Sequence, residues 1–201
     1  MSTSSDGRAQ RGESTRSALL VAARQRFCNG GFAGTSVRDI AETAGVHTAL
    51  VTYHFGTKRK LWEQVVSHAM GSLVAAIGAR VNVDSDPSTL ARNALSAYLD
   101  HLDEAPDFPR LIVRAVLDGD PIVLDVARTH LRPLVASSTA LSTLPDAEQW
   151  LLTIFGATVV PYLYREMLTE AFATDPLSES HAERRRHHLM QLVELALQET
   201  P

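Results

Sequence analysis

The chain has 201 residues, 45% of them hydrophobic, and a formal net charge of −4 at pH 7. This length allows a full hydrophobic core, and the single cysteine, Cys28, excludes an internal disulfide, so the chain is not a small disulfide-stapled scaffold. Residues 1–60 carry nine Lys/Arg against four Asp/Glu, whereas residues 61–201 carry ten against nineteen. The overall charge alone argues against a nucleic-acid partner, but the basic N-terminal third is where such a partner would bind.

The first fourteen residues are polar and lack the apolar core of a signal peptide. We expect residues 1–14 to form a flexible basic arm, which either reaches a nucleic acid or stays a solvated tail. A chain without a cysteine framework belongs most naturally in a reducing compartment. We therefore expect a cytoplasmic protein in which Cys28 is a small buried hydrophobe rather than a redox sensor.

Two short helices are predicted after a first helix that runs from about Thr15 to Asn29, with its inner stripe at Leu20, Ala23 and Phe27. The second helix begins at Ser36, where Asp39 completes a capping-box pattern, and Gly45 ends it. The third is expected from about His47 to Tyr53. Its inner side holds Leu50 and Val51, which pack with Val46.

The outer side of the third helix is short or polar, because it consists of His47, Thr48, Ala49 and Thr52. Such a face fits into a DNA major groove and can meet base edges, which a bulky or acidic face could not do. We therefore expect these residues to contact bases.

The next helix starts with three cations, Lys58, Arg59 and Lys60, after a plausible N-cap at Thr57. Cations at a helix N-terminus are disfavoured by a few tenths to about 1 kcal/mol each, and a bound phosphate removes this conflict. The segment 54–58 is thus expected to clamp the DNA backbone. Arg38 either pairs with Glu42 or contacts phosphate as well.

The stretch from about Thr15 to Leu61 resembles the DNA-binding domain of the tetracycline-repressor (TetR) family of bacterial transcription regulators. The resemblance is carried by fixed spacings of Phe27, Gly30-Gly31-Phe32, Thr35, Val37-Arg38-Asp39-Ile40-Ala41, Ala44-Gly45-Val46, Tyr53-His54-Phe55, Lys58 and Leu61. It implies base contacts by the outer face of the third helix. It implies phosphate contacts by Thr35, Ser36, Tyr53, His54 and Lys58, to which we add Arg38.

The remainder of the chain also reads as helical. A fourth helix is predicted over 58–80, followed by helices over 88–104, 108–117, 121–137, 145–172 and 180–199, and no segment has the alternation of a strand. The predicted fold is all-α: a three-helix DNA-binding domain with a helix-turn-helix over 15–60, and a larger ligand-binding and dimerisation domain over 61–201.

The segment from Trp150 to Tyr164 is apolar almost all round, so it is expected to be covered on several sides, by the domain's own pocket or by a second copy of the chain. The last helix carries an apolar stripe that we assign to a homodimer interface, as the family resemblance also implies: Leu189, Leu192, Val193 and Ala196. Packing within the chain is the alternative for this stripe.

The resemblance places a small-molecule effector among the helices of the larger domain. Candidate pocket residues are Trp62, Tyr98, His101, Phe108, Arg114, Trp150, Phe155 and Tyr162. For each of them, packing in the hydrophobic core is the alternative. An inward-facing Arg114 would favour an anionic ligand, and Pro161 could kink the wall.

No Gly-rich phosphate loop, nucleophile elbow or HExxH pattern is present, so we expect neither an enzyme nor a cofactor. The run 184–188 (RRRHH) is expected to be a solvated helix face and not a metal site. The predicted function is a ligand-responsive repressor that binds a palindromic DNA operator as a homodimer, with no membrane partner. The alternatives are a small-molecule-binding helical module without DNA binding and an activator of the same fold.

Overall fold

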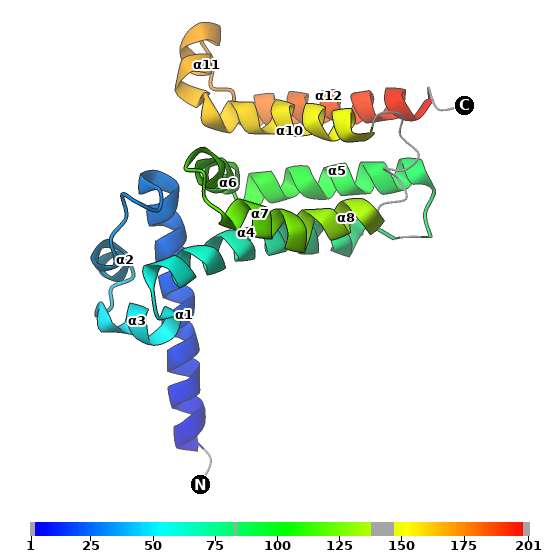
Figure 1. Ribbon diagram of the computed structural model, residues 1–201. Coiled ribbons are helices and arrows are strands. Elements are labelled where there is room, and N and C mark those ends of the chain that lie inside the picture. Colours follow the sequence, from blue (N-terminus) through cyan, green and yellow to red (C-terminus); the bar gives the residue numbers. More distant parts are fainter. Residues whose placement is uncertain (1–2, 83, 138–146, 199–201) are drawn as a thin grey trace. The chain divides into compact units, whose positions relative to one another are not determined.

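The computed structural model describes residues 3–82, 84–137 and 147–198. These residues form helices and connecting turns with no strand, which confirms the all-α prediction (Figure 1). Within the same ranges, no helix combines the length and apolarity that crossing a membrane would require. The chain divides into two compact units, which we call the N-terminal unit (Met1–Ala69 with Leu111–Val126) and the C-terminal unit (Met70–Arg110 with Ala127–Pro201).

The N-terminal unit contains three complete helices at its start: α1 (Thr3–Gly30), α2 (Val37–Thr43) and α3 (Ala49–Phe55). It also holds the first half of α4 (Lys58–Arg80), most of α6 (Phe108–Leu117) and all of α7 (Ile122–Val126). Its core is made of side chains with at most 3% exposure, among them Leu19, Phe27, Ile40, Val51, Phe55, Leu61 and Trp62.

Helix α1 is longer than the sequence predicted, because it begins at Thr3 and not at about Thr15. The predicted flexible arm is therefore helical from Thr3 on, and Figure 1 shows these turns extending beyond α2 and α3. Nothing in this segment breaks a helix as proline would, and Glu13 lies one turn from Arg16, 3.9 Å away. The inner stripe of α1 also runs through Leu19 instead of the predicted Leu20.

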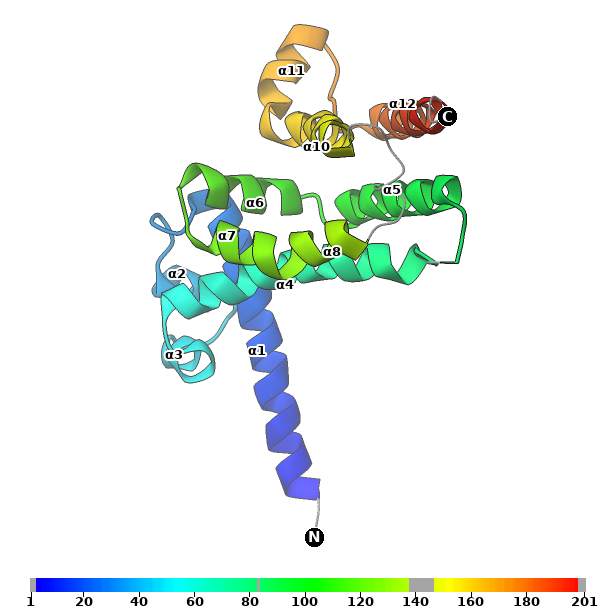
Figure 2. The ribbon, with the colours of Figure 1, turned by 45° about the vertical axis from the view of Figure 1, so that its right-hand side comes forward.

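The C-terminal unit is built around α5 (Pro87–Glu104), whose N-cap is Asp86. The other helices are η1 (a π-helix, Ala127–Leu131), α8 (Arg132–Ser137), α10 (Ala147–Leu163), α11 (Arg165–Phe172) and α12 (Glu179–Gln198). In both ribbon views α5 lies between the second half of α4 and the pair α10 and α12 (Figure 2). Buried Leu95 and Leu99 of α5 pack against Leu189 and Val193 of α12.

Two predicted helices are interrupted. The segment 121–137 forms α7, η1 and α8. Pro133 has no N–H to donate, and its ring displaces the carbonyl of the residue four positions earlier. The backbone hydrogen bonds therefore change to the wider spacing of a π-helix over 127–131. The predicted helix 145–172 forms α10 and α11, since Pro161 removes a hydrogen bond near the end of α10 and Tyr164 leaves helical geometry with φ −110°. Residues 145, 146 and 199 of the predictions lie outside the described ranges.

The stripe of α12 belongs to the core of its own chain. Leu189, Val193 and Ala196 are at most 7% exposed, and Leu192 packs half-buried against the same cluster. The assignment of this stripe to a dimer interface is therefore corrected to the intramolecular alternative. Its apolar period is the same in both cases, and only the position of α5 decides between them.

The division into units also differs from the predicted domain boundary at residue 61. Leu61, Trp62, Val65 and Val66 are buried, and the first half of α4 clusters with α1 to α3. Residues 111–126 join the N-terminal unit although the chain on both sides of them belongs to the C-terminal unit. Such a long-range association cannot be read from helical periodicity.

Candidate nucleic-acid interface

Helix α2 starts with the predicted capping box. The Ser36 hydroxyl accepts a hydrogen bond from the Asp39 backbone N–H (3.1 Å), and the Asp39 carboxylate accepts from the backbone N–H (3.0 Å) and the hydroxyl (2.6 Å) of Ser36. The side-chain hydrogen bond from Ser36 is the main reason that the pKa of Asp39 is lowered. Gly45, at φ +66°, makes the turn into α3, where a residue with a Cβ would be strained.

Helix α3 buries one side and exposes the other as predicted. Val51 and Phe55 are 1% and 3% exposed. The exposed side holds all four expected base-contacting residues: His47, Thr48, Ala49 and Thr52. The helix begins two residues later than predicted, at Ala49, but the N–H groups of Leu50 and Val51 already bond to the carbonyls of residues 47 and 48. His47 Nδ1 accepts from the Ala49 N–H at 3.2 Å, which in the neutral ring leaves the proton on Nε2 as an outward donor.

Four of the expected phosphate-contacting residues are accessible. Ser36, Arg38 and Tyr53 are exposed, with Tyr53 at 80%, and His54 is half-buried with its ring edge-on to that of Tyr53, 5.0 Å between centroids. In the sequence these residues flank the exposed residues of α3. Contacts with the DNA backbone would therefore lie on both sides of the base contacts.

Thr35 does not fit the phosphate role expected of it. It is 3% exposed, and its hydroxyl donates to the carbonyls of Gly31 (2.8 Å) and Arg26 (3.1 Å) at the end of α1. This side chain closes the C-terminal end of α1 and cannot at the same time reach solvent. The expectation is corrected to a structural role.

Lys58 also has partners within the unit. Its ammonium donates to the carbonyls of Phe32 (2.9 Å) and Thr35 (3.0 Å) and lies 4.3 Å from the centroid of the Phe32 ring. The cation at the start of α4 is thus stabilised by the loop 31–36 and needs no phosphate to offset the helix dipole. The predicted clamp at 54–58 stays a prediction, and the exposed Lys60 offers a further cation in this turn.

Arg59 and Asp120 form a contact that was not predicted from the sequence. The guanidinium of Arg59 donates to both carboxylate oxygens of Asp120 at 2.7 Å, and Asp120 also accepts from Trp62 Nε1 (3.0 Å) and the Ile122 N–H (2.9 Å). Burial raises the pKa of Asp120, but these hydrogen bonds outweigh burial and hold the pKa below its ordinary value. The residues are far apart in sequence, and the only signal is that each breaks a local pattern: a cation at a helix start and a carboxylate beside a proline.

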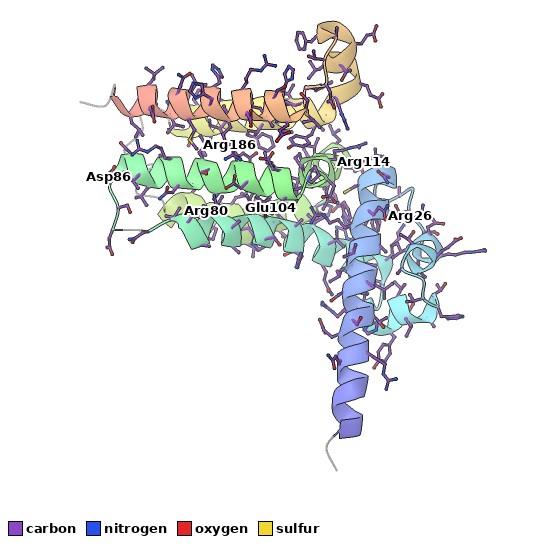
Figure 3. The ribbon with its side chains drawn as sticks, turned by 180° about the vertical axis from the view of Figure 1, so that it is seen from behind. Arg26, Arg80, Asp86, Glu104, Arg114 and Arg186 are labelled. Atoms are coloured by element: carbon purple, nitrogen blue, oxygen red, sulfur yellow. The ribbon has the colours of Figure 1, made fainter. Side chains whose placement is uncertain are left out.

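Two arginines of α1 contact α2, α3 and α4. Arg16 donates to Gln64 Oε1 of α4 (2.7 Å), and its guanidinium carbon lies 5.4 Å from the centroid of the Phe55 ring in α3. Arg26, labelled in Figure 3, donates to Thr43 Oγ1 of α2 at 2.7 Å. The exposed side of α3 is therefore held by a packed and hydrogen-bonded frame.

The residues expected to line an effector pocket are divided between the two units. Trp62 and Arg114 belong to the N-terminal unit. Trp62 is fully buried against Phe27, 4.9 Å between centroids, so it is core. Arg114 has a 45% exposed side chain that faces Asp118, 3.5 Å away, so it does not turn inward as an anion-binding group.

The other expected pocket residues lie in the C-terminal unit. Tyr98 bonds to Thr158 (2.9 Å), and burial raises the pKa of its hydroxyl to about 12. Buried His101 packs edge-on against Phe108, with ring centroids 5.2 Å apart. Trp150 is half-buried and Phe155 is 48% exposed. Tyr162 lines a cleft of about 450 Å³ at the start of α12.

The run at 184–188 is tied to its own helix and its neighbours. Arg184 bonds to His181 and the Ser180 carbonyl, Arg185 to the Pro176 carbonyl, and Arg186 to Asp100 and Asp103. Over the ranges that the structure describes, no three or more His, Cys, Asp or Glu side chains are grouped so as to hold a metal ion.

Residues 19–65 match the family model of bacterial regulatory proteins of the tetR family. The chain is 29% identical over 126 residues to the HTH-type transcriptional regulator RutR of Escherichia coli K12, and 33% identical over 110 residues to the HTH-type transcriptional repressor Rv3405c of Mycobacterium tuberculosis H37Rv. These alignments cover 63% and 55% of this chain but only 59% and 50% of the relatives' own lengths.

Two solved structures show the same fold over most of the chain. SCO4942 of Streptomyces coelicolor superposes with a TM-score of 0.66 at 26% identity, covering 93% of this chain and 99% of that one. A TetR-like transcriptional regulator from Rhodococcus sp. RHA1 gives a TM-score of 0.70 at 18% identity, covering 92% and 96%. Residues 19–65 thus form a helix-turn-helix domain of the TetR family, and the described residues as a whole share the all-helical fold of these regulators.

Proposed function

We propose that this protein is a ligand-responsive repressor that binds a palindromic DNA operator as a homodimer and leaves it when a small-molecule effector binds. The observation that carries the proposal is the exposed side of α3, which consists of His47, Thr48, Ala49 and Thr52. The opposite side of the helix is held in the core by the buried Val51 and Phe55. Short hydroxyls, a methyl group and an imidazole donor match the groups that base edges present in a major groove.

Contacts with the DNA backbone in this proposal come from Ser36, Arg38, Tyr53 and His54, with Lys60 in place of the predicted Lys58. Phosphate contacts orient the protein without reading sequence, and each one adds to the salt dependence of binding. The net charge of +5 over residues 1–60 supports this assignment.

Homodimerisation is proposed through the outer side of α10, because the stripe of α12 is already covered. Large apolar side chains are exposed there, with Leu151 at 40%, Leu152 at 64% and Phe155 at 48%, and Leu195 of α12 is exposed at 57%. A second copy of this face would cover these side chains, whereas solvent makes their exposure unfavourable. Two reading helices about 34 to 36 Å apart would then meet successive major grooves of a palindrome.

Release by an effector requires a route from the C-terminal unit to α3. Residues 111–126 are part of the N-terminal unit, but the chain enters and leaves this segment from the C-terminal unit. Because the Arg59–Asp120 pair fastens the segment to the start of α4, a shift of the chain at either end would act on the helix that follows α3. A coupling of about 1 to 3 kcal/mol suffices for regulation.

The proposal is tested by capturing genomic DNA fragments on the immobilised protein over a series of salt concentrations. We expect specific fragments to be retained at low salt and lost steeply as salt rises, and a Thr48→Ala/Thr52→Ala double variant to lose them. Thr174→Ala, an exposed threonine of the C-terminal unit, is the matched control and should behave as wild type.

Retention of no fragment in dilute buffer would favour the alternative, a small-molecule-binding module without DNA binding. Reporter expression from a retained promoter separates repressor from activator, since deletion of the gene should raise expression in the first case and lower it in the second. A cytoplasmic location stays a prediction based on the single cysteine.

A further inference from the structure

Helix α11 presents an apolar stripe that the described residues leave uncovered. The stripe follows the i, i+3, i+4, i+7 and i+8 spacing of one helix side, beginning at the N-cap residue, and consists of Tyr164, Met167, Leu168, Ala171 and Phe172. Tyr164 is 50% exposed, Met167 60% and Phe172 66%, and none of the eight residues of α11 is buried. The rest of the helix is polar: Arg165, Glu166, Thr169 and Glu170.

A helix this short needs a surface to pack against. Isolated helices of fewer than about 12 residues are marginal in water, and most of their stability in proteins comes from packing of the apolar side. The ion pair between Arg165 and Asp175 (2.6 Å) closes the loop after α11, but Arg165 is exposed, and such a pair contributes at most about 1 kcal/mol. We therefore expect the stripe of α11 to be covered in the working protein.

The place of α11 within the C-terminal unit indicates what covers it. In both ribbon views α11 projects from the layer of α10 and α12 on the side away from α5 (Figure 1, Figure 2). Along the chain, exposed apolar side chains continue from α10 into α11 through Leu163 and Tyr164. A molecule that docks on the free side of this layer would therefore meet α11 as well.

The area needed for a stable dimer favours a second copy of the chain as that molecule. Permanent homodimers bury about 2,000 Å² or more in total, about 65% of it apolar, so each copy must supply about 650 Å² of apolar surface. At roughly 200 Å² for a whole large side chain, about 400 Å² comes from the residues already assigned to the dimer: Leu151, Leu152, Phe155 and Leu195. The exposed parts of Val160, Leu163 and the α11 stripe raise this area to about 900 Å².

We propose that α11 is a docking arm whose apolar stripe packs against the C-terminal unit of a second copy of this chain, beside the outer side of α10. The inference rests on the proposed function, because it extends the proposed homodimer. Burial of the stripe leaves Glu166 and Glu170 on the opposite side of the helix, and Arg165 at its edge is already paired with Asp175. In a twofold dimer both arms dock, so each substitution in the stripe acts twice.

Sedimentation velocity over a series of protein concentrations tests the docking arm. The double variant Met167→Glu/Phe172→Glu should raise the dimer dissociation constant at least about hundredfold, equivalent to about 2.8 kcal/mol. The matched control is Glu166→Gln/Glu170→Gln, on the polar side of the same helix, which should dimerise as wild type does. Because no residue of α11 is buried, circular dichroism should show that both variants are folded.

Hydrogen–deuterium exchange gives a second readout that requires no substitution in α11. The amides of residues 165–172 should exchange at least about tenfold more slowly in the wild-type dimer than in the Leu152→Glu/Phe155→Glu monomer. Wild-type dimerisation of the α11 variant, or equal exchange in dimer and monomer, would overturn the docking arm and leave the proposed dimer intact, whereas a monomeric wild type would reject both. Binding of wild type but not of the α11 variant to phosphatidylglycerol vesicles, with dimerisation unchanged, would assign the stripe to a lipid surface and also overturn the proposal.

Discussion

Thr48 is the residue on the exposed side of α3 whose substitution tests base reading most specifically. Its hydroxyl can bond to either member of a base pair, so Thr48→Ala should change the preference at one position of the half-site by about 1 to 3 kcal/mol. The measurement is the affinity of wild type and variant for a panel of operator duplexes that differ at single positions. An equal loss of affinity for every duplex would show that Thr48 contacts the DNA backbone or only supports the fold.

Lys58 is predicted to act on stability and not on DNA. Lys58→Ala removes the donor to two carbonyls of the loop 31–36, and the free energy of unfolding should fall by about 1.5 to 3 kcal/mol in urea titrations. The control is Lys60→Ala, since this exposed neighbour should change stability by less than about 0.5 kcal/mol. Unchanged stability of the Lys58 variant, together with a shallower salt dependence of DNA binding, would show that Lys58 contacts a phosphate instead.

Asp120 should make stability depend on pH in a definite window. Its pKa in the folded protein is lowered, so its stabilising effect is complete above the unfolded-state value of about 3.9 and is lost as the pH falls through the folded-state pKa. Asp120→Asn weakens the hydrogen bonds from Arg59 and should lower the free energy of unfolding at pH 7 by about 1.5 to 3 kcal/mol. The difference from wild type should shrink below about pH 4. A difference that stays constant down to pH 2 would mean that the charge of Asp120 has no part in it.

The turn from α1 to α2 requires glycine at Gly34, because a side chain there would clash with the backbone of Gly30. A Cβ on Gly34 would clash with the carbonyl oxygen of Gly30, which belongs to backbone that cannot easily move. Gly34→Ala should therefore destabilise the protein by about 1 to 3 kcal/mol in urea titrations. Gly12→Ala is the opposite control, because Gly12 lies within α1 with nothing near its Cβ, and alanine should stabilise the helix by about 0.5 to 1 kcal/mol. Equal effects of the two variants would refute the steric argument.

The elements themselves could largely be predicted from the sequence, since helix ends are encoded locally. The capping box at Ser36, the Thr57 cap of α4 and the bounds of α6 were all predicted correctly, because caps, glycines and prolines act within a few residues. The outer side of α3 follows from periodicity in the same way. The start of α1 was missed because its first turns have no apolar stripe to mark them.

Contacts between distant segments could not be predicted. Lys58 and Arg59 look like free cations in the sequence, and only the positions of Phe32 and Asp120 show that they are paired. Likewise, the stripe of α12 has the same pattern whether α5 or a second molecule covers it. Its true neighbour was decided by packing within the C-terminal unit.

For the whole molecule, the proposed dimer predicts where a charge will break association. Leu152→Glu/Phe155→Glu places two carboxylates on the exposed side of α10 and should convert the dimer to a folded monomer in sedimentation-velocity experiments. Leu117→Glu, at a residue 77% exposed in the N-terminal unit, should leave the dimer intact. A wild-type protein that is monomeric at micromolar concentration would contradict the assignment.

Selection from a pool of random DNA duplexes tests whether paired α3 helices read a palindrome, because it requires no knowledge of the operator. We expect an enriched inverted repeat whose half-sites are centred about 34 to 36 Å apart, bound by two chains and lost when the outer side of α3 is substituted. Enrichment of no sequence at low salt, or of a sequence that the Thr48→Ala/Thr52→Ala variant selects equally well, would contradict it.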